Sequence, residues 1–307
     1  MEFIVGKWPE NEVELLKKVR EKLKDKLADR PQYVPVVGDN KLIRFIRGHN
    51  HDFKKICEMV EKYLDMRKEK QLDEIYKDII DNNLDHPTKF PNGKKILELD
   101  DKILMMNPKA VDNDGTFVSV EGVLKPEMFD VISIEEYIRF RMYCMEYISM
   151  LLTSESFKLE KQELARRKEN NVDHDKPYGQ LAKIVCIRDT TGLSIFQFNS
   201  VTKNVSSQLL KFSTDNYPEL LKRVFVINTG FVFTTVWAFV KMFLVQKTVD
   251  KIKILGSDWK STVLEFMPES SLLEWLGGTM PCVHEHLAVW EGLKDDPEIE
   301  NKAPEST

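Results

Sequence analysis

The stretch DNYPELLKRVFVINTGFVFTTVWAFVKMFL, residues 215–244, carries the strongest structural signal in the sequence. A short apolar run ending at an Asn-Thr-Gly turn predicts a buried strand over residues 224–227. The residues after the turn predict a strongly apolar helix over residues 231–244. Residues 224–240 contain no charged side chain, but they fall short of the about 20 apolar residues that a membrane span needs. The stretch therefore predicts a strand and a helix inside a folded domain.

Strand and helix patterns alternate along most of the chain. Short apolar runs bounded by turn residues predict strands over residues 116–120, 181–189 and 251–256. Apolar residues at helical spacing predict helices over residues 133–152 and 200–215. Such alternation is typical of an α/β fold, in which helices cover a mainly parallel sheet.

The first part of the chain shows helical spacing and no strand signal. Residues 10–69 predict several helices, and Asp52 is the expected N-cap of the last one. We therefore predict a small all-helical lobe over residues 1–75, an α/β domain over residues 76–282, and a C-terminal tail over residues 283–307.

Composition limits the class of protein. The 307 residues carry a net charge of −5, which argues against a general nucleic-acid binder because such proteins usually have a basic excess. Hydrophobic residues make up 42% of the chain, enough for a sizeable core. The four cysteines form no CxxC pair, and no signal-peptide pattern opens the sequence. We expect reduced thiols and a cytoplasmic location, and a monomer because no pattern indicates a coiled coil.

The known signatures of catalysis are missing from the sequence. It contains no GxSxG, GxxxxGK[ST], GxGxxG or HExxH motif. His284 and His286 flank Glu285, but two histidines at this spacing do not share a helix face, and no further ligand completes a metal set. We predict that the protein is not an enzyme, with no catalytic residue, no metal and no cofactor.

Several segments resemble the CRAL-TRIO family, which includes phosphatidylinositol/phosphatidylcholine transfer proteins and carriers of retinoids or tocopherol. The resemblance extends from about residue 41 to residue 279, and the order and spacing of its pieces make it specific. The pieces are RFIRG (44–48), DNDG (112–115), DTTGLS (189–194), DNYPELLKRVFVIN (215–228), KMFL (241–244), KTVDKIKILGS (247–257) and LLEWLGGT (272–279).

This resemblance implies a CRAL-TRIO lipid-binding domain over residues 76–282, with an apolar cavity closed by a movable gate helix over residues 231–244. A helix that is apolar all round must bury both sides, and a gate does so by facing acyl chains inside and a bilayer outside. The alternative is an ordinary core helix. The expected pocket and gate side chains are Phe231, Phe233, Val236, Trp237, Val240 and Phe243.

For phosphatidylinositol-binding relatives, the resemblance implies headgroup contacts from Glu219, Thr248 and Lys251. A lysine and a hydroxyl suit a phosphate, and a carboxylate accepts hydrogen bonds from inositol hydroxyls. The same family carries an Arg-Lys pair after the RFIRG-like segment, where this chain has His49 and Asn50. We expect His49 and Asn50 to take the place of that pair at the headgroup, and the departure weakens the expected phosphate clamp.

Phosphatidylcholine-binding relatives carry small hydroxyl residues at two strand positions that correspond here to Ile184 and Cys186, which we expect to line the pocket. Loss of these hydroxyls removes partners for a polar headgroup and puts phosphatidylcholine in doubt. A more apolar ligand, such as a sterol, a diglyceride or an isoprenoid, is the alternative.

We therefore predict a lipid-binding or lipid-transfer protein that holds one phospholipid or other hydrophobic ligand and visits membrane surfaces transiently. A second interpretation is a protein-interaction module of the same fold, because some relatives bind small GTPases, and presentation of the lipid to a lipid kinase is a related task. Residues 155–176 are densely charged and are expected to form a solvated helix end and loop, which could serve as a docking surface. A lipid hydrolase is a weaker third interpretation, because no nucleophile motif is present.

Overall fold

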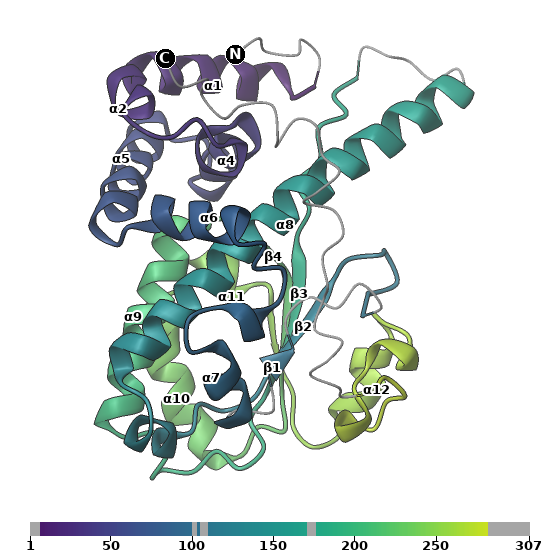
Figure 1. Ribbon diagram of the computed structural model, residues 1–307. Coiled ribbons are helices and arrows are strands. Elements are labelled where there is room, and N and C mark those ends of the chain that lie inside the picture. The colour runs from purple at the N-terminus through teal and green to yellow at the C-terminus, as the bar shows by residue number, and fades with distance from the viewer. Residues whose placement is uncertain (1–6, 100–102, 105–109, 171–175, 282–307) are drawn as a thin grey trace.

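The computed structural model describes residues 7–99, 103–104, 110–170 and 176–281 (Figure 1). A five-stranded sheet with the order β1-β2-β3-β4-β5 forms its centre. β2 to β5 run parallel, and β1 pairs with β2 in the antiparallel direction. The strands are β1 (Ile103–Leu104), β2 (Val118–Glu121), β3 (Ile184–Asp189), β4 (Leu221–Ile227) and β5 (Ile252–Ile254). The predicted α/β fold with a mainly parallel sheet is confirmed.

Helices cover both faces of the sheet. Figure 1 shows one group on the left and α12 (Trp259–Leu264) on the right. The left-hand group contains α7 (Gly93–Leu99), α8 (Ile134–Glu169), α9 (Ser200–Asn216), α10 (Phe231–Lys241) and α11 (Gln246–Val249). Single 3₁₀ turns complete the domain at η1 (Pro87–Lys89), η2 (Pro126–Asp130), η3 (Glu269–Ser271) and η4 (Glu274–Leu276).

The N-terminal helices pack together above the sheet, in purple and blue in Figure 1. They are α1 (Glu10–Lys22), α2 (Lys24–Ala28), α3 (Val34–Val37), α4 (Asp39–Gly48), α5 (Phe53–Glu69) and α6 (Leu72–Asp81). Asp52 caps α5 as expected, because its side chain accepts a hydrogen bond from the backbone N–H of Lys55 at 3.0 Å. The predicted limit of the helical lobe, between residues 75 and 76, falls inside α6, and the division into domains stays a prediction.

α8 is longer than the helix that the sequence predicts. It starts at a capping box, in which Ser133 and Glu136 satisfy each other's backbone N–H groups. It then continues to Glu169 through the charged segment for which the sequence predicts a helix end and loop. Here Glu163 pairs with Arg166 and Arg167, each at 2.8 Å, so charges along one helix face stabilise the extension.

Buried polar groups join the N-terminal helices to the rest of the chain. Arg67 in α5 is almost inaccessible and forms two hydrogen bonds to Glu146 in α8, at 2.9 and 3.0 Å. Tyr217, which follows α9, donates its hydroxyl to the same carboxylate. Lys41 in α4 is also buried and donates to the carbonyl of Asn216 at 2.9 Å. Because each buried charge has a specific partner, these contacts fix how α4 and α5 sit against α8 and α9.

Candidate functional site

The two faces of the sheet have different surroundings. On one face Phe225 packs its ring against Phe266, just beyond α12, and is fully buried. On the other face Cys186 lies between Ser119 of β2 and Val224 of β4 in the strand register. This second face turns toward α8, because Arg141 of α8 pairs with Glu121 on it. Its side chains retain slight accessibility near the middle of the sheet and much more at Ile254, at the edge.

Ile184 and Cys186, the two predicted pocket residues on β3, lie on this second face, because alternate residues of a strand point the same way. Both are nearly buried. Burial raises the pKa of the Cys186 thiol to about 11, and Ser119 donates its hydroxyl to the sulfur at 3.1 Å. The thiol is therefore protonated near neutral pH, which makes it a poor nucleophile.

α10 begins after Gly230, as predicted, and ends at Lys241, three residues earlier than expected. Apolar side chains surround it, yet Phe233 is the one member of this helix that is buried. The Phe233 ring stacks on Trp237 at 6.3 Å between centroids, and Val236 and Trp237 pack against the core. The Phe231 side chain is fully exposed. An apolar helix with so little burial is unlike a core helix, which hides its apolar surface on all sides.

Other apolar side chains stand exposed near the same strands and helix. Val240 and Phe243 are partly accessible, and the Phe239 ring contacts Phe198 at 5.5 Å and Phe243 at 5.2 Å. The large hydrophobic residues exposed after β3, at the end of α10 and on β5 are Ile195, Phe196, Met242, Val245 and Ile254. Ile195 and Phe196 were not predicted, although this apolar pair directly follows the DTTGLS segment.

Glu219 is the centre of a compact charged cluster at the start of β4. Its carboxylate lies 2.6 Å from Lys247 Nζ, 2.9 Å from Lys183 Nζ and 3.6 Å from Lys251 Nζ. Burial alone would raise the pKa of Glu219, but hydrogen bonds from Lys247 and Lys183 outweigh it and lower the pKa to about 2. Three ammonium groups around one carboxylate leave a net positive charge, which suits an anionic ligand.

The backbone of Glu219 is held in an uncommon conformation. Its φ of 57° lies in the left-handed region, which a non-glycine residue adopts at a cost. Arg44, buried in α4, stabilises this turn by donating to the carbonyl of Glu219 at 2.8 Å and to that of Ala182 at 2.8 Å. The N-terminal helices therefore position the carboxylate among its lysines.

Two of the other predicted headgroup residues lie beside this cluster. Lys251 donates to the carbonyl of Leu221 at 2.9 Å, and burial together with the charges of Lys183 and Lys247 lowers its pKa. Thr248 lies in α11, half-buried and one residue after Lys247. Lys183 and Lys247 were not predicted, because no spacing in the sequence reveals that they approach Glu219.

His49 and Asn50 lie at the end of α4 but not in this cluster. The His49 ring stacks on Phe45 at 6.1 Å between centroids, and Asn50 is exposed in a left-handed turn. Among the described residues, no hydrogen bond or ion pair joins either side chain to Glu219, Thr248 or Lys251. From the same segment, the Arg47 carbonyl accepts a hydrogen bond from Lys247 at 3.0 Å. The role predicted for His49 and Asn50 in headgroup binding stays a prediction.

A family model for the CRAL/TRIO domain matches residues 102–278, more than half of the chain. The chain belongs to the CRAL/TRIO family. The match contains the second sheet face, α10 and the Glu219 cluster, while the N-terminal helices that support Glu219 lie outside it.

Curated relatives in the CRAL/TRIO family include transfer proteins. The chain is 28% identical over 264 residues to "Phosphatidylinositol/phosphatidylcholine transfer protein SFH9" of Arabidopsis thaliana, covering 84% of this chain and 40% of that protein. It is 28% identical over 253 residues to "Sec14 cytosolic factor" of Schizosaccharomyces pombe, covering 81% of this chain and 78% of that protein. The chain thus spans about two fifths of the length of SFH9.

A solved structure supports the CRAL/TRIO fold. The crystal structure of Sfh5 matches with a TM-score of 0.54 at 17% identity, covering 85% of this chain and 84% of that one. At this level of identity the likeness concerns the fold alone.

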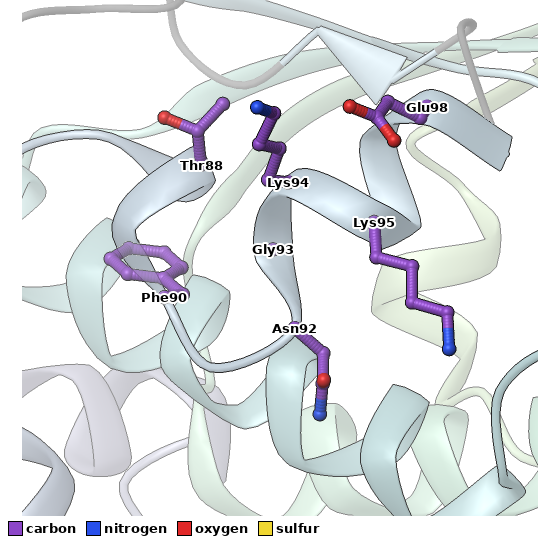
Figure 2. A pocket seen from close by; sticks show the side chains of 7 residues that line it. All are labelled: Thr88, Phe90, Asn92, Gly93, Lys94, Lys95 and Glu98. Atoms are coloured by element: carbon purple, nitrogen blue, oxygen red, sulfur yellow. The ribbon is translucent and has the colours of Figure 1, made fainter.

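A separate hollow of about 430 Å³ lies at the surface beside α7. Its lining side chains include Phe90, Lys94, Lys95 and Glu98 (Figure 2). Figure 2 shows Lys94 and Lys95 pointing in opposite directions, and Lys95 donates to the carbonyl of Val131 at 2.9 Å. Because its charged groups do not converge, this hollow is a weaker candidate site than the Glu219 cluster.

Searches for other kinds of site were negative in the part of the chain that the structure describes. There, no group of three or more His, Cys, Asp or Glu side chains is arranged to hold a metal ion. His284 and His286 lie outside the described residues, as does the predicted tail over residues 283–307. In the described ranges, none of the helices has the length and apolar character to cross a membrane.

Proposed function

We propose that this chain binds one lipid between α10 and the sheet face that carries Ile184 and Cys186, and exchanges it with membranes. The observation that supports this proposal most strongly is α10 itself, an apolar helix in which Phe233 is the one buried side chain. Exposed apolar surface of this kind marks a binding site for an apolar ligand or a membrane. On this proposal the chemistry is binding and exchange, not bond cleavage, and no cofactor takes part.

The energetics of a buried lipid favour exchange. Two acyl chains contain on the order of 30 CH₂ groups, each worth about 0.8 kcal/mol on leaving water. The same gain accompanies transfer from water to a bilayer and from water to an apolar pocket. The difference between membrane and pocket is therefore small, and the movement of α10 would control the rate and not the direction.

We propose phosphatidylinositol as the phospholipid, with its headgroup at the Glu219 cluster. Lys251 and the Thr248 hydroxyl would contact the phosphate, and Glu219 would accept hydrogen bonds from inositol hydroxyls. The excess of lysines over carboxylates in the cluster supports an anionic headgroup. The names of SFH9 and related transfer proteins agree with this choice, and the missing hydroxyls at Ile184 and Cys186 argue against phosphatidylcholine.

We also propose that the exposed apolar residues around α10 touch the membrane while the lipid is exchanged. They include Phe196, Phe231 and Met242, each far more exposed than is usual for a large apolar side chain. Such a contact would be transient, because the protein must leave again with its lipid.

Mass spectrometry of lipids extracted from the purified protein tests this proposal. The protein is first incubated with vesicles that contain phosphatidylinositol, phosphatidylcholine, a sterol and a diglyceride, and is then separated from them. One phosphatidylinositol per protein would support the full proposal. A neutral lipid would keep the pocket and α10 but remove the headgroup assignment. Absence of any lipid would refute the proposal and favour an interaction module of the same fold.

A further inference from the structure

Arg188 places a charge on the proposed lipid-binding face of the sheet. It follows Ile184 and Cys186 at two-residue spacing on β3, so its side chain leaves the sheet on the same side. Its guanidinium pairs with Glu121, its direct neighbour in the strand register on β2. Arg141 of α8 approaches the same carboxylate, with Nη2 2.9 Å from Oε1. Two guanidinium groups thus share one carboxylate.

The Arg188 side chain is partly accessible and partly desolvated. Its side chain is 42% accessible, yet burial lowers its pKa to about 10. Burial lowers the pKa of Arg44 by the same amount, although the Arg44 side chain is enclosed on all sides. Because this face of β3 also carries Ile184 and Cys186, the accessible part of the guanidinium lies on the side of the sheet where the lipid is proposed to bind.

Arg188 has hydrogen-bonding capacity that the described residues do not use. A guanidinium has five N–H donors. Within the described residues, Glu121 is the one ion-pair partner of Arg188, and no further hydrogen bond from its guanidinium is found. The nearest strand neighbours on the same face are apolar, with Val226 opposite Arg188 and Cys186 two residues before it. A further acceptor would stabilise a partly desolvated guanidinium with apolar neighbours, because its remaining donors have little access to other polar groups of the described residues.

This charge is well separated from the Glu219 cluster. The backbone N–H of Ile184 donates to the carbonyl of Leu220 at 2.8 Å. Because Leu220 directly follows Glu219, the start of β3 lies beside Glu219. Arg188 lies four residues further along the strand, a displacement of about 13 Å at the usual rise of a β-strand. The proposed cavity therefore has positive charge at both ends of the strand, with apolar side chains between.

We propose that Arg188 and Arg141 form a second anion-binding site inside the cavity, which takes the acid group of a single-headed anionic lipid, a carboxylate or a phosphate monoester. The inference rests on the proposed lipid-binding function, and it adds a ligand class that the Glu219 cluster does not require. The acid group would bind the free donors of Arg188, while the lipid chains lie along Ile184, Cys186 and α10. Bidentate pairing with a guanidinium suits both acid groups.

Paired lipids with and without the acid group test this inference. The purified full-length chain is incubated with phosphatidylcholine vesicles that carry radiolabelled oleic acid, oleyl alcohol, dioleoyl phosphatidic acid or dioleoylglycerol, and is repurified before the bound lipid is counted. We expect the acid of at least one pair to be retained about tenfold better than its neutral partner, the effect of one charge-assisted hydrogen bond. A preference for oleic acid over oleyl alcohol alone identifies a carboxylate ligand. A preference for phosphatidic acid over dioleoylglycerol alone identifies a phosphate ligand.

Three variants give the test its direction. Arg188→Met keeps an unbranched apolar side chain but removes all five N–H donors, and is expected to abolish the preference. Glu121→Gln removes the competing carboxylate and is expected to raise acid binding several-fold, which a purely structural ion network would not do. If Arg188→Met does not fold, as judged by circular dichroism, the Glu121→Gln result decides. Arg166→Met is the matched control, because Arg166 is an exposed partner of Glu163 on the outer part of α8.

Retention of all four lipids without an acid preference would overturn the inference and leave the proposed function intact. A preference that survives Arg188→Met and is unchanged by Glu121→Gln would also overturn it. Failure to retain any lipid would refute the proposed function as well.

Discussion

Replacing Glu219 by Gln removes the charge that holds Lys183, Lys247 and Lys251 together at the start of β4. The ionised carboxylate stabilises the folded state, because folding lowers its pKa from 4.5 to about 2. A change of this size corresponds to about 3 kcal/mol near neutral pH, since each pH unit is worth about 1.4 kcal/mol. Screening by solvent at the partly exposed Lys247 lowers the expected loss in the variant to roughly 2 kcal/mol.

The sign of the pH dependence follows from the lowered pKa. The carboxylate contributes fully to stability above the pKa of the unfolded state, 4.5, and the contribution is lost as pH falls toward about 2. More than half of it is gone at about pH 3. The free energy of unfolding of the wild type should therefore fall more steeply than that of Glu219→Gln between about pH 5 and pH 3.

Urea unfolding followed by circular dichroism at a series of pH values measures this difference. Glu265→Gln is the matched control, because it removes an exposed carboxylate for which no ion pair is found in the described part of the chain. Equal stability of Glu219→Gln and wild type near neutral pH would refute the reasoning, as would parallel pH profiles.

Three further predictions address binding, exchange and the buried contacts. Lys251→Ala should lower phosphatidylinositol transfer between vesicles about tenfold and leave the fold intact, as expected for a lost charge-assisted hydrogen bond. Lys253→Ala is the control, because Lys253 lies beside Phe225 in the strand register and its ammonium group packs on the Phe266 ring; an equal effect of both variants would contradict the assignment. Trp237→Asp should slow lipid exchange several-fold in the same assay, because it places a charge on the apolar surface of α10, whereas the control Ser261→Asp on α12 should leave exchange unchanged. Normal exchange in Trp237→Asp would indicate that α10 does not move during exchange. Arg67→Met should destabilise the protein by about 3 to 5 kcal/mol in urea unfolding, because Glu146 is left buried without its cation, and adding Glu146→Gln should recover part of the loss. A small effect of Arg67→Met alone would show that the pair is less buried than its geometry indicates.

β2 to β5 and α10 could be predicted from the sequence, because β3 and β4 are buried and form short apolar runs between turn residues, whereas the two-residue β1 was not predicted. The end of α8 could not be predicted, because the stability of its last turns depends on charge pairs such as Glu163 with Arg167 and not on apolar spacing. The predicted end of α10 was wrong by three residues, since residues 242–244 form turns that continue its apolar pattern.

The candidate site could be predicted in part. Glu219, Thr248 and Lys251 could be named from the sequence, because they sit within recognisable motifs of the family. Lys183 approaches Glu219 only because β3 pairs with β4, and no local pattern carries that information. The ion pair of Arg188 could not be predicted either, because Glu121 approaches Arg188 only through the pairing of β2 with β3.

Both ends of α10 are tied to the rest of the molecule. Before the helix, Thr229 donates its backbone N–H and its hydroxyl to the carbonyl of Leu255, at 3.1 and 2.9 Å. Beyond it, Lys247 binds Glu219 and the carbonyl of Arg47. A helix anchored at two points can pivot about the line between them but cannot drift away from the sheet. Opening of the proposed lipid site would then be a rigid hinge rotation of α10 on the microsecond to millisecond timescale, and neighbouring elements would not need to unfold.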